Sequence, residues 1–449
     1  MDYVRIFFVS GRAVTLKTDA ALNPDIDELG FMPISPRCIG MSMTEYKIKR
    51  LGHHGDGIAE GPIYVPMTLP GETVSGTVDG TRLMNVRITH PSTQRVAAPC
   101  RHFKSCGGCQ IQHASDTFVA DWKIEVVRES LRAQGLDAEF RDIQTSPEKS
   151  RRRATLSLRR TKKGAMVGFH ARASDVLVAI PDCQLLHPKL ISAIPAIEAL
   201  GVVGASRKAE LSVVATLSDA GLDFAVSGGK PMDTPLFQAL AQVMEQYGIA
   251  RLCWDGEIVG IRNPPTQRFG NANVVPPPGA FMQATLEGEE TLLAAVKEIT
   301  KSANRILDLF SGCGTFTLPL AQNAEIHAVE SDAEMLKAMD LGWRNASGLK
   351  TVTHEVRDLF RRPLMKDELK KFDAAVVDPP RAGAEAQIAE LAASKIKQIA
   401  YVSCNPVTFA RDAARLVEAG YRLNWIRVVD QFRWSSHVEL VADFTLISA

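Results

Sequence analysis

The sequence lacks any apolar run of the roughly 20 residues that a membrane-spanning helix needs. It also lacks a secretory leader, because the apolar stretch at residues 6–9 is too short for the hydrophobic part of a signal peptide. Nor is there an excess of charge, since the formal net charge is +1. These absences predict a cytoplasmic protein that needs no membrane. They also exclude a uniformly basic nucleic-acid coat, although local basic patches can still bind RNA.

The chain nevertheless has the length and the apolar content for several domains. Its 449 residues, 45% hydrophobic and 23% charged, predict an ordinary globular protein of two or three domains. Eight cysteines without a secretory signal favour metal binding or catalysis over a disulfide scaffold. No obligate protein partner is indicated.

Residues 1–43 differ from the rest of the chain, because they show no clear periodicity and include a Pro-rich piece at 32–36. Two interpretations compete: a flexible extension, or an upstream reading that is absent from the natural protein. We favour the second. No function is assigned to this segment or to Cys38.

Residues 44–96 contain short alternating stretches that are separated by Gly and Pro at close spacing, which predicts a small β-barrel. This pattern resembles the TRAM domain of RNA-modifying enzymes. Basic side chains give the barrel a surface suited to RNA, although they could equally form a solvated face. They are Lys47, Lys49, Arg50, His53, His54, Arg82 and Arg87.

A cysteine cluster follows the predicted barrel. Cys100, Cys106 and Cys109 lie within ten residues, and Cys183 is the nearest candidate for a fourth ligand. Four thiolates suit either tetrahedral zinc or a 4Fe–4S cluster. The five-residue gap between the first two cysteines is less typical of zinc ribbons and favours iron–sulfur.

The cluster belongs to an expected central RNA-binding domain at 97–270. Helical periodicity runs from Asp116 to Gly135, and a mixed α/β pattern follows at 143–265. A dense basic run at 149–163 includes Arg152 and Arg153, which we predict to contact phosphate. Pro-rich residues 264–280 predict a linker or rigid approach to the last domain, at 271–449.

From residue 306 onward, strand and helix patterns alternate, which predicts an α/β domain with a doubly wound parallel sheet. The first strand leads into a Gly-rich turn around Gly312 and Gly314. The next strand ends in Glu330, a position from which a carboxylate can accept the ribose hydroxyls of a nucleoside. No third Gly follows, so the turn favours S-adenosyl-L-methionine over NAD.

Three further residues follow or adjoin predicted strands of this domain. Asp378 precedes two prolines that make a rigid loop. Cys404 follows the strand at 398–402, where it is either a nucleophile or a small buried side chain. Glu439 is either a surface carboxylate or a base close to the thiol.

Together these motifs resemble the uridine-5 RNA methyltransferase family over residues 44–449. Within it, the chain is most similar to the 23S rRNA enzymes that carry both a TRAM domain and a 4Fe–4S cluster. The matching stretches are Gly279-Ala280-Phe281-Met282-Gln283, Asp308-Leu309-Phe310-Ser311-Gly312-Cys313-Gly314, Asp378-Pro379-Pro380-Arg381, Ser403-Cys404-Asn405-Pro406 and His437-Val438-Glu439, with the four cysteines.

The resemblance implies a class I S-adenosyl-L-methionine-dependent methyltransferase fold and methylation of C5 of a specific uridine in 23S rRNA. Cys404 would attack C6 of the base, and Glu439 would remove the C5 proton. The cluster of Cys100, Cys106, Cys109 and Cys183 would shape RNA binding, and the target base must leave its stack. The implied cofactor-binding residues are Gln283, Phe310, Thr315, Glu330 and Asp378.

Some positions depart from the family pattern. Ser311 and Cys313 differ in the glycine turn, and Thr315 stands where Asn is frequent. Arg433 and Ser436 replace the usual Pro and Thr near the proposed base, which puts local loop geometry in doubt.

Three alternative functions stay open. The first is a tRNA uridine-5 methyltransferase. The second is an RNA cytosine-5 methyltransferase, although the additional Cys that such enzymes carry in the loop at Asp378 is missing. The third is a non-catalytic RNA-binding protein, against which both Cys404 and Glu439 are present.

Overall fold

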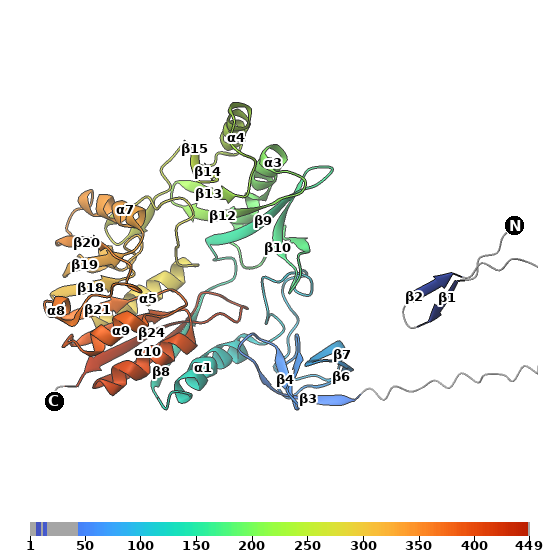
Figure 1. Cartoon of the computed structure of the whole chain (residues 1–449), viewed down its shortest axis with the longest axis horizontal. Helices are drawn as coiled ribbons and strands as arrows, with labels where there is room; N and C mark the ends of the chain where they lie inside the picture. Colours follow the sequence, from blue (N-terminus) through green and yellow to red (C-terminus); the bar gives the residue numbers. More distant parts are fainter. Residues whose placement is uncertain (1–5, 10–11, 16–43, 448–449) are drawn as a thin grey trace, which may run out of the picture. The chain divides into compact units, whose positions relative to one another are not determined.

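The computed structural model describes residues 6–9, 12–15 and 44–447, and the chain divides into the units Met1–Met43 and Thr44–Ala449 (Figure 1). In the first unit, β1 (Ile6–Val9) and β2 (Arg12–Thr15) form an antiparallel hairpin. Cys38 lies outside the described residues. No helix in the described ranges is both long and apolar enough to cross a membrane.

The second unit begins with a closed five-stranded barrel, which confirms the predicted small barrel. Ile48, Val65, Val74 and Leu83 alternate with exposed residues and fill its interior. A second apolar cluster, which includes Leu51 and Trp122, joins the barrel to the first long helix. The strands lie in the order β3 (Glu45–Leu51), β4 (Gly57–Ala59), β5 (Ile63–Val65), β7 (Arg82–His90) and β6 (Thr73–Asp79).

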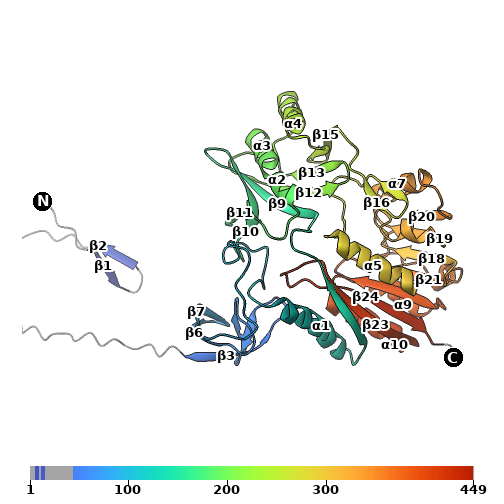
Figure 2. The same ribbon diagram turned by 180° about the vertical axis from the view of Figure 1, so that it is seen from behind.

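A seven-stranded sheet follows, with its helices packed on one face (Figure 2). Leu156, Leu158, Leu211 and Val213 point from its central strands into the core beneath these helices, as period-two patterning requires. The strand order is β11 (Leu177–Ala179), β10 (Ala165–His170), β9 (Arg153–Arg160), β12 (Glu210–Ser218), β13 (Gly221–Ser227), β14 (Arg251–Trp254) and β15 (Glu257–Ile261). The helices are α2 (Pro188–Ser192), α3 (Ile194–Gly204) and α4 (Thr234–Tyr247).

The third part of this unit is an eight-stranded sheet, which confirms the predicted doubly wound α/β architecture. Its first five strands run parallel, β24 is antiparallel to both of its neighbours, and β8 lies parallel to β23 at the edge. The order is β20 (Val352–Val356), β19 (Glu325–Glu330), β18 (Arg305–Leu309), β21 (Ala374–Val377), β22 (Gln398–Ser403), β24 (Glu439–Leu446), β23 (Tyr421–Asp430) and β8 (Glu139–Thr145).

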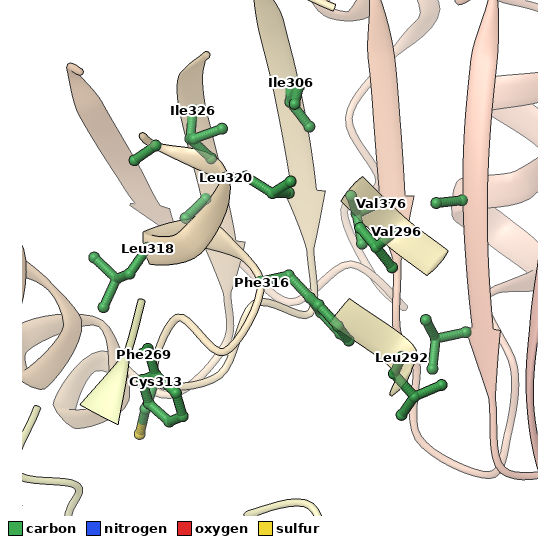
Figure 3. Packing of buried hydrophobic residues seen from close by; sticks show 14 of the residues in the cluster. Phe269, Leu292, Val296, Ile306, Cys313, Phe316, Leu318, Leu320, Ile326 and Val376 are labelled. Atoms are coloured by element: carbon green, nitrogen blue, oxygen red, sulfur yellow. The ribbon is translucent and has the colours of Figure 1, made fainter. Parts of the chain in front are cut away.

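Helices cover both faces of this sheet. On one face, Leu292 and Val296 pack toward Phe316 and Val376, and Ile306 lies in the same cluster (Figure 3). This face carries α5 (Leu286–Ile299), α6 (Thr317–Leu320) and α7 (Ala333–Arg344). The other carries α1 (Asp116–Arg132), α8 (Lys366–Leu369), α9 (Glu385–Ala392) and α10 (Pro406–Glu418). Burial on both faces explains why the parallel strands are almost wholly apolar.

The pairing adds detail to the predicted domain boundaries, which stay predictions. α1 and β8 lie within the range expected for the central domain, yet they pack with the catalytic sheet. The expected linker contains a hairpin of β16 (Gln267–Phe269) and β17 (Ala272–Val274). Phe269 and Val274 of that hairpin belong to the catalytic core, so this segment is more than a connection.

Candidate active site

Cys404 stands where a strand becomes a helix. β22 ends at Ser403, and the Asn405 side chain caps α10 by accepting a hydrogen bond from the Val407 backbone N–H (3.1 Å). Pro406 fits the first helical position because it has no N–H to satisfy there. The thiol is therefore held, half-buried, at the carboxyl edge of the sheet, where ligands bind in such folds.

A cavity of about 470 Å³ lies at this edge. Five of the seven residues predicted for catalysis and cofactor binding line it: Phe310, Glu330, Asp378, Cys404 and Glu439. The structure thus brings together side chains that are up to 129 positions apart in the sequence.

The glycine turn positions one side of the cavity. Gly312 has a φ of +54° and donates its backbone N–H to Glu330 Oε2 (3.1 Å). Gly314 has a φ of +89°, and a Cβ there would lie 2.6 Å from Met339 Cγ. Both glycines are needed, one for a left-handed turn beside the carboxylate and one for close packing. The other Glu330 oxygen, Oε1, accepts from Ser331, so the carboxylate is fixed at the tip of β19.

The remaining two predicted residues do not line this cavity. Gln283 is 2% exposed and reaches Glu439 only through Gln431. Thr315 lines a separate cavity beside Ser218 and Arg268 of the central region. Thr315 therefore does not line this cavity, and its contact with the cofactor stays a prediction.

Sequence reasoning missed several residues that line the cavity. Asp358 and Phe360 lie in the loop after β20, and the centres of the Phe310 and Phe360 rings are 5.6 Å apart. Phe281 also contributes and is 60% exposed. Asp358 and Phe360 could have been found from their position after a parallel strand, since all such strand ends meet at one edge.

Burial controls the charge of the cavity. It raises the pKa of Glu439 to about 8 and that of Asp378 to about 7, and mutual repulsion with neighbouring carboxylates adds to both increases. Burial and these two carboxylates raise the pKa of the Cys404 thiol to about 11, which Arg381 partly opposes. Two carboxyl groups that titrate near neutrality suit proton transfer.

His437 is neutral in this site. Burial, with the nearby cations Arg381 and Lys123, lowers its pKa to about 4. Arg381 donates to the imidazole, with Nη2 3.0 Å from Nδ1. The pair encloses the cavity at Cys404 and lies beside Phe432, whose ring meets the imidazole edge-on at 5.7 Å.

A second cavity, of about 580 Å³, opens on the other side of Cys404. It shares Cys404, Arg381 and His437 with the first cavity and extends to His53 and His54 of the barrel. The thiol can therefore be approached from two directions.

The four predicted metal ligands also converge. Cys100, Cys106, Cys109 and Cys183 are free thiols that line one cavity of about 20 Å³. The loop passes so close to β10 that a Cβ at Gly107 would lie 2.7 Å from His170 O. Within residues 44–447, however, no group of three or more Cys, His, Asp or Glu side chains is arranged to hold a metal ion.

The basic run does not behave as predicted. Arg152 pairs with the buried carboxylate of Glu289 and donates to Gln283 O (3.2 Å). Arg153 donates to Ala280 O (3.1 Å) and to Gly279 O (3.0 Å). Both guanidinium groups are half-buried and their described bonds go to protein acceptors, which argues against the prediction that these two arginines contact phosphate.

Comparisons with known proteins agree with this geometry. The family tRNA (Uracil-5-)-methyltransferase matches residues 276–443. An uncharacterized RNA methyltransferase of Rhizobium meliloti (strain 1021) is 44% identical over 411 residues, covering 90% of this chain and 99% of the relative. The 23S rRNA (uracil(1939)-C(5))-methyltransferase of Shewanella sp. (strain ANA-3) is 31% identical, covering 89% and 95%.

One solved structure shares the fold over most of the chain. It is the Pyrococcus abyssi tRNA (uracil-54, C5)-methyltransferase in complex with S-adenosyl-L-homocysteine, with a TM-score of 0.71 and 24% identity. The match covers 90% of this chain and 100% of the other.

Proposed function

We propose, since the chain belongs to the family of RNA uracil-5 methyltransferases, that it methylates C5 of a specific uridine in 23S rRNA. The observation that carries the proposal is the grouping of Cys404, Asp378 and Glu439 around one cavity at the carboxyl edge of the sheet. The 23S rRNA substrate is favoured because the Shewanella relative that acts on it aligns with 89% of this chain.

The chemistry of uracil explains the need for a thiol and a base. C5 is a poor nucleophile until Cys404 adds through sulfur to C6, which makes the ring an enolate. After C5 gains its methyl group, Glu439 takes the C5 proton. The electron pair of that C–H bond forms the C5–C6 double bond, and the C6–S bond breaks to release the thiolate. Asp378 would position the uracil near the thiol.

The cavity suits the cofactor. S-adenosyl-L-methionine, when bound, supplies an electrophilic methyl group. Glu330 would accept hydrogen bonds from its ribose, and Phe310, Phe360 and Asp378 would line its binding site. Gln283, which does not line the cavity, would act indirectly through its hydrogen bond with Gln431.

The second cavity suits the RNA. Since C6 must reach Cys404, the target uridine must leave its stack. The cavity joins the thiol to His53 and His54 of the barrel, which we propose to be a TRAM domain that binds the flanking RNA. A nucleotide could thus enter from the side opposite the cofactor.

The four cysteines fit a 4Fe–4S cluster in their donor set, because soft thiolates are the ligands that such clusters take. Cys100, Cys106, Cys109 and Cys183 would hold it, and it would shape the RNA-binding surface. Iron and acid-labile sulfide measured in anaerobically purified protein test this, with Cys183→Ser as the comparison. Four irons that Cys183→Ser loses support the proposal, whereas stoichiometric zinc contradicts it.

The function is tested by nucleoside mass spectrometry of 23S rRNA and tRNA from cells with and without the gene. Loss of 5-methyluridine from 23S rRNA alone is expected. Loss from tRNA alone would move the substrate, and loss of 5-methylcytidine would change the reaction.

Purified protein provides the second test. Cys404→Ala should abolish methyl transfer and the covalent RNA adduct while RNA binding persists. Cys253→Ala, which removes a buried thiol from β14 of the central sheet, serves as the matched control and should retain transfer. Transfer that persists in Cys404→Ala would reject the thiol as the nucleophile.

A further inference from the structure

The Gln431 side chain is a buried amide whose described hydrogen bonds all go to Glu439 or to the segment of Gln283 and Ala284. It is 2% exposed. Its Nε2 donates to Gln283 Oε1 (2.5 Å) and to Glu439 Oε2 (3.2 Å), and its Oε1 accepts from the Ala284 N–H (2.8 Å).

These bonds fix which way the amide faces. An amide nitrogen carries two hydrogens, and both have an acceptor here. The oxygen must face the Ala284 N–H, so the nitrogen must face Gln283 and Glu439. Reversing the amide would set oxygen against a carboxylate and nitrogen against an N–H.

The packing around Gln431 holds it in this place. On α5, a Cβ at Gly288 would lie 2.8 Å from Gln431 Cβ, so only glycine allows the approach. Arg152 holds the segment that Gln431 binds. Its guanidinium donates to the backbone oxygen of Gln283, and its backbone N–H donates to Ala284 O (2.9 Å). The amide thus lies between two fixed elements.

We infer that Gln431 is a positioning residue that aims the Glu439 carboxylate at the C5 proton and links it to the cofactor side of the cavity through Gln283. The inference rests on the proposed function. Gln431 binds the side-chain oxygen of Gln283, and Phe281 of the same segment lines the cavity. The base and the cofactor-binding segment therefore share one amide.

The bond also acts on the charge of the base. Glu439 faces Asp378 and Cys404, which oppose its ionisation, and Arg381, which favours it. Near it are neutral His437 and the buried pair of Lys123, on α1, with Asp430, at the end of β23. Donation from Gln431 lowers the pKa of Glu439 against the effect of burial. Without that donation, the base is ionised only at higher pH.

The test is Gln431→Leu, assayed for methyl transfer and for the covalent enzyme–RNA adduct on denaturing gels. Because Glu439 must take the C5 proton before Cys404 can leave, slow proton removal makes the adduct accumulate. We expect a several-fold larger adduct fraction at pH 7, an adduct that decays faster as pH rises to 9, and a raised KM for the cofactor. Adduct decay with the pH profile and KM of the wild type would overturn the inference.

Two further variants separate positioning from folding. Gly288→Ala displaces Gln431 without changing its chemistry, and it should shift the same profile by a smaller amount. Gln387→Leu removes another fully buried glutamine, which binds Leu364 through its amide and lies outside the cavity. It should leave the pH profile of adduct decay unchanged; an equal shift would assign the Gln431→Leu effect to general destabilisation.

Glu439→Gln keeps the inference distinct from the proposed function. If this variant traps no adduct, the proposed function fails. If it traps adduct while Gln431→Leu and Gly288→Ala behave as wild type, only the positioning role fails.

Discussion

Two regions of this protein bury charge, and they do so in opposite ways. At the catalytic edge, the charge of Asp378 opposes ionisation of the buried Glu439, and the surroundings raise the pKa of Asp378 to about 7 and that of Glu439 to about 8. In the basic run, Arg152 is paired with Glu289 and Arg153 donates to two carbonyl oxygens. The first arrangement lets its groups change charge near neutral pH, whereas the second holds its cations on protein acceptors.

The difference shows which charged groups can take part in a reaction. A carboxyl group whose ionisation is opposed by its surroundings can exchange a proton during a reaction, which is the usual property of a catalytic acid or base. A guanidinium that donates to a carboxylate or to backbone carbonyl oxygens of the fold has no such freedom and serves the structure. Substitutions in the two regions should therefore fail in different ways.

The largest effect is expected for Glu439→Gln. Loss of a positioned base costs a factor on the order of 10² to 10⁴ in rate. Turnover should fall by that much while the covalent RNA adduct persists, measured by methyl transfer and denaturing gels. Glu334→Gln changes an exposed carboxylate on α7 and should turn over as the wild type does. A similar loss in both variants would contradict a specific role.

Arg152→Met should unfold the protein more easily rather than weaken RNA binding alone. It leaves Glu289 buried and unpaired, a situation that costs about 3 to 5 kcal/mol. Denaturant unfolding measures this, and a raised KM for the cofactor should accompany it because the Gln283 backbone loses a donor.

The double variant Arg152→Met/Glu289→Met is the control, because it removes both charges and should recover most of the loss. Lys337→Met breaks an exposed pair with Glu334 and should leave unfolding unchanged. If Arg152→Met is as stable as the wild type but binds RNA more weakly, the prediction that Arg152 contacts phosphate is restored.

These two regions also mark how far the sequence can predict the molecule. The strand ends that carry Glu330, Asp378 and Cys404 were predictable, because a parallel sheet brings its carboxyl ends to one edge. The direction of Arg152 was not, because a run of arginines is the same in sequence whether the side chains face water or a carboxylate 137 positions away.

Long-range partners account for the other misses. Lys123 follows Trp122 in an amphipathic helix, where a lysine is expected to be exposed. It is fully buried, with its Nζ 2.5 Å from Asp430 Oδ1. The sequence does not single out Gln431, because no local pattern indicates its contacts with Gln283 and Glu439. Such pairings depend on the assembled sheet, not on spacing.

The pH dependence of stability sharpens the contrast. The pKa of Glu439 rises from 4.5 to about 8 on folding, so between these values the unfolded chain binds fewer protons than the folded one. Stability should therefore fall as pH rises through this window, by at most about 1.4 kcal/mol per pH unit. Glu439→Gln should lessen the fall. The midpoint temperature of its thermal unfolding should therefore be higher than that of the wild type at pH 8.5 but not at pH 5. Parallel curves would contradict the burial argument.

The smallest effect is expected where the basic run remains at the surface. Lys162 and Lys163 lie exposed at the turn between β9 and β10, so replacing both with Ala should leave unfolding unchanged. If these lysines contact phosphate, RNA affinity falls and the salt dependence of binding loses about one unit of slope for each contact. Fluorescence titration of an rRNA fragment over a range of salt measures this. An unchanged slope would show that these two lysines do not contact phosphate.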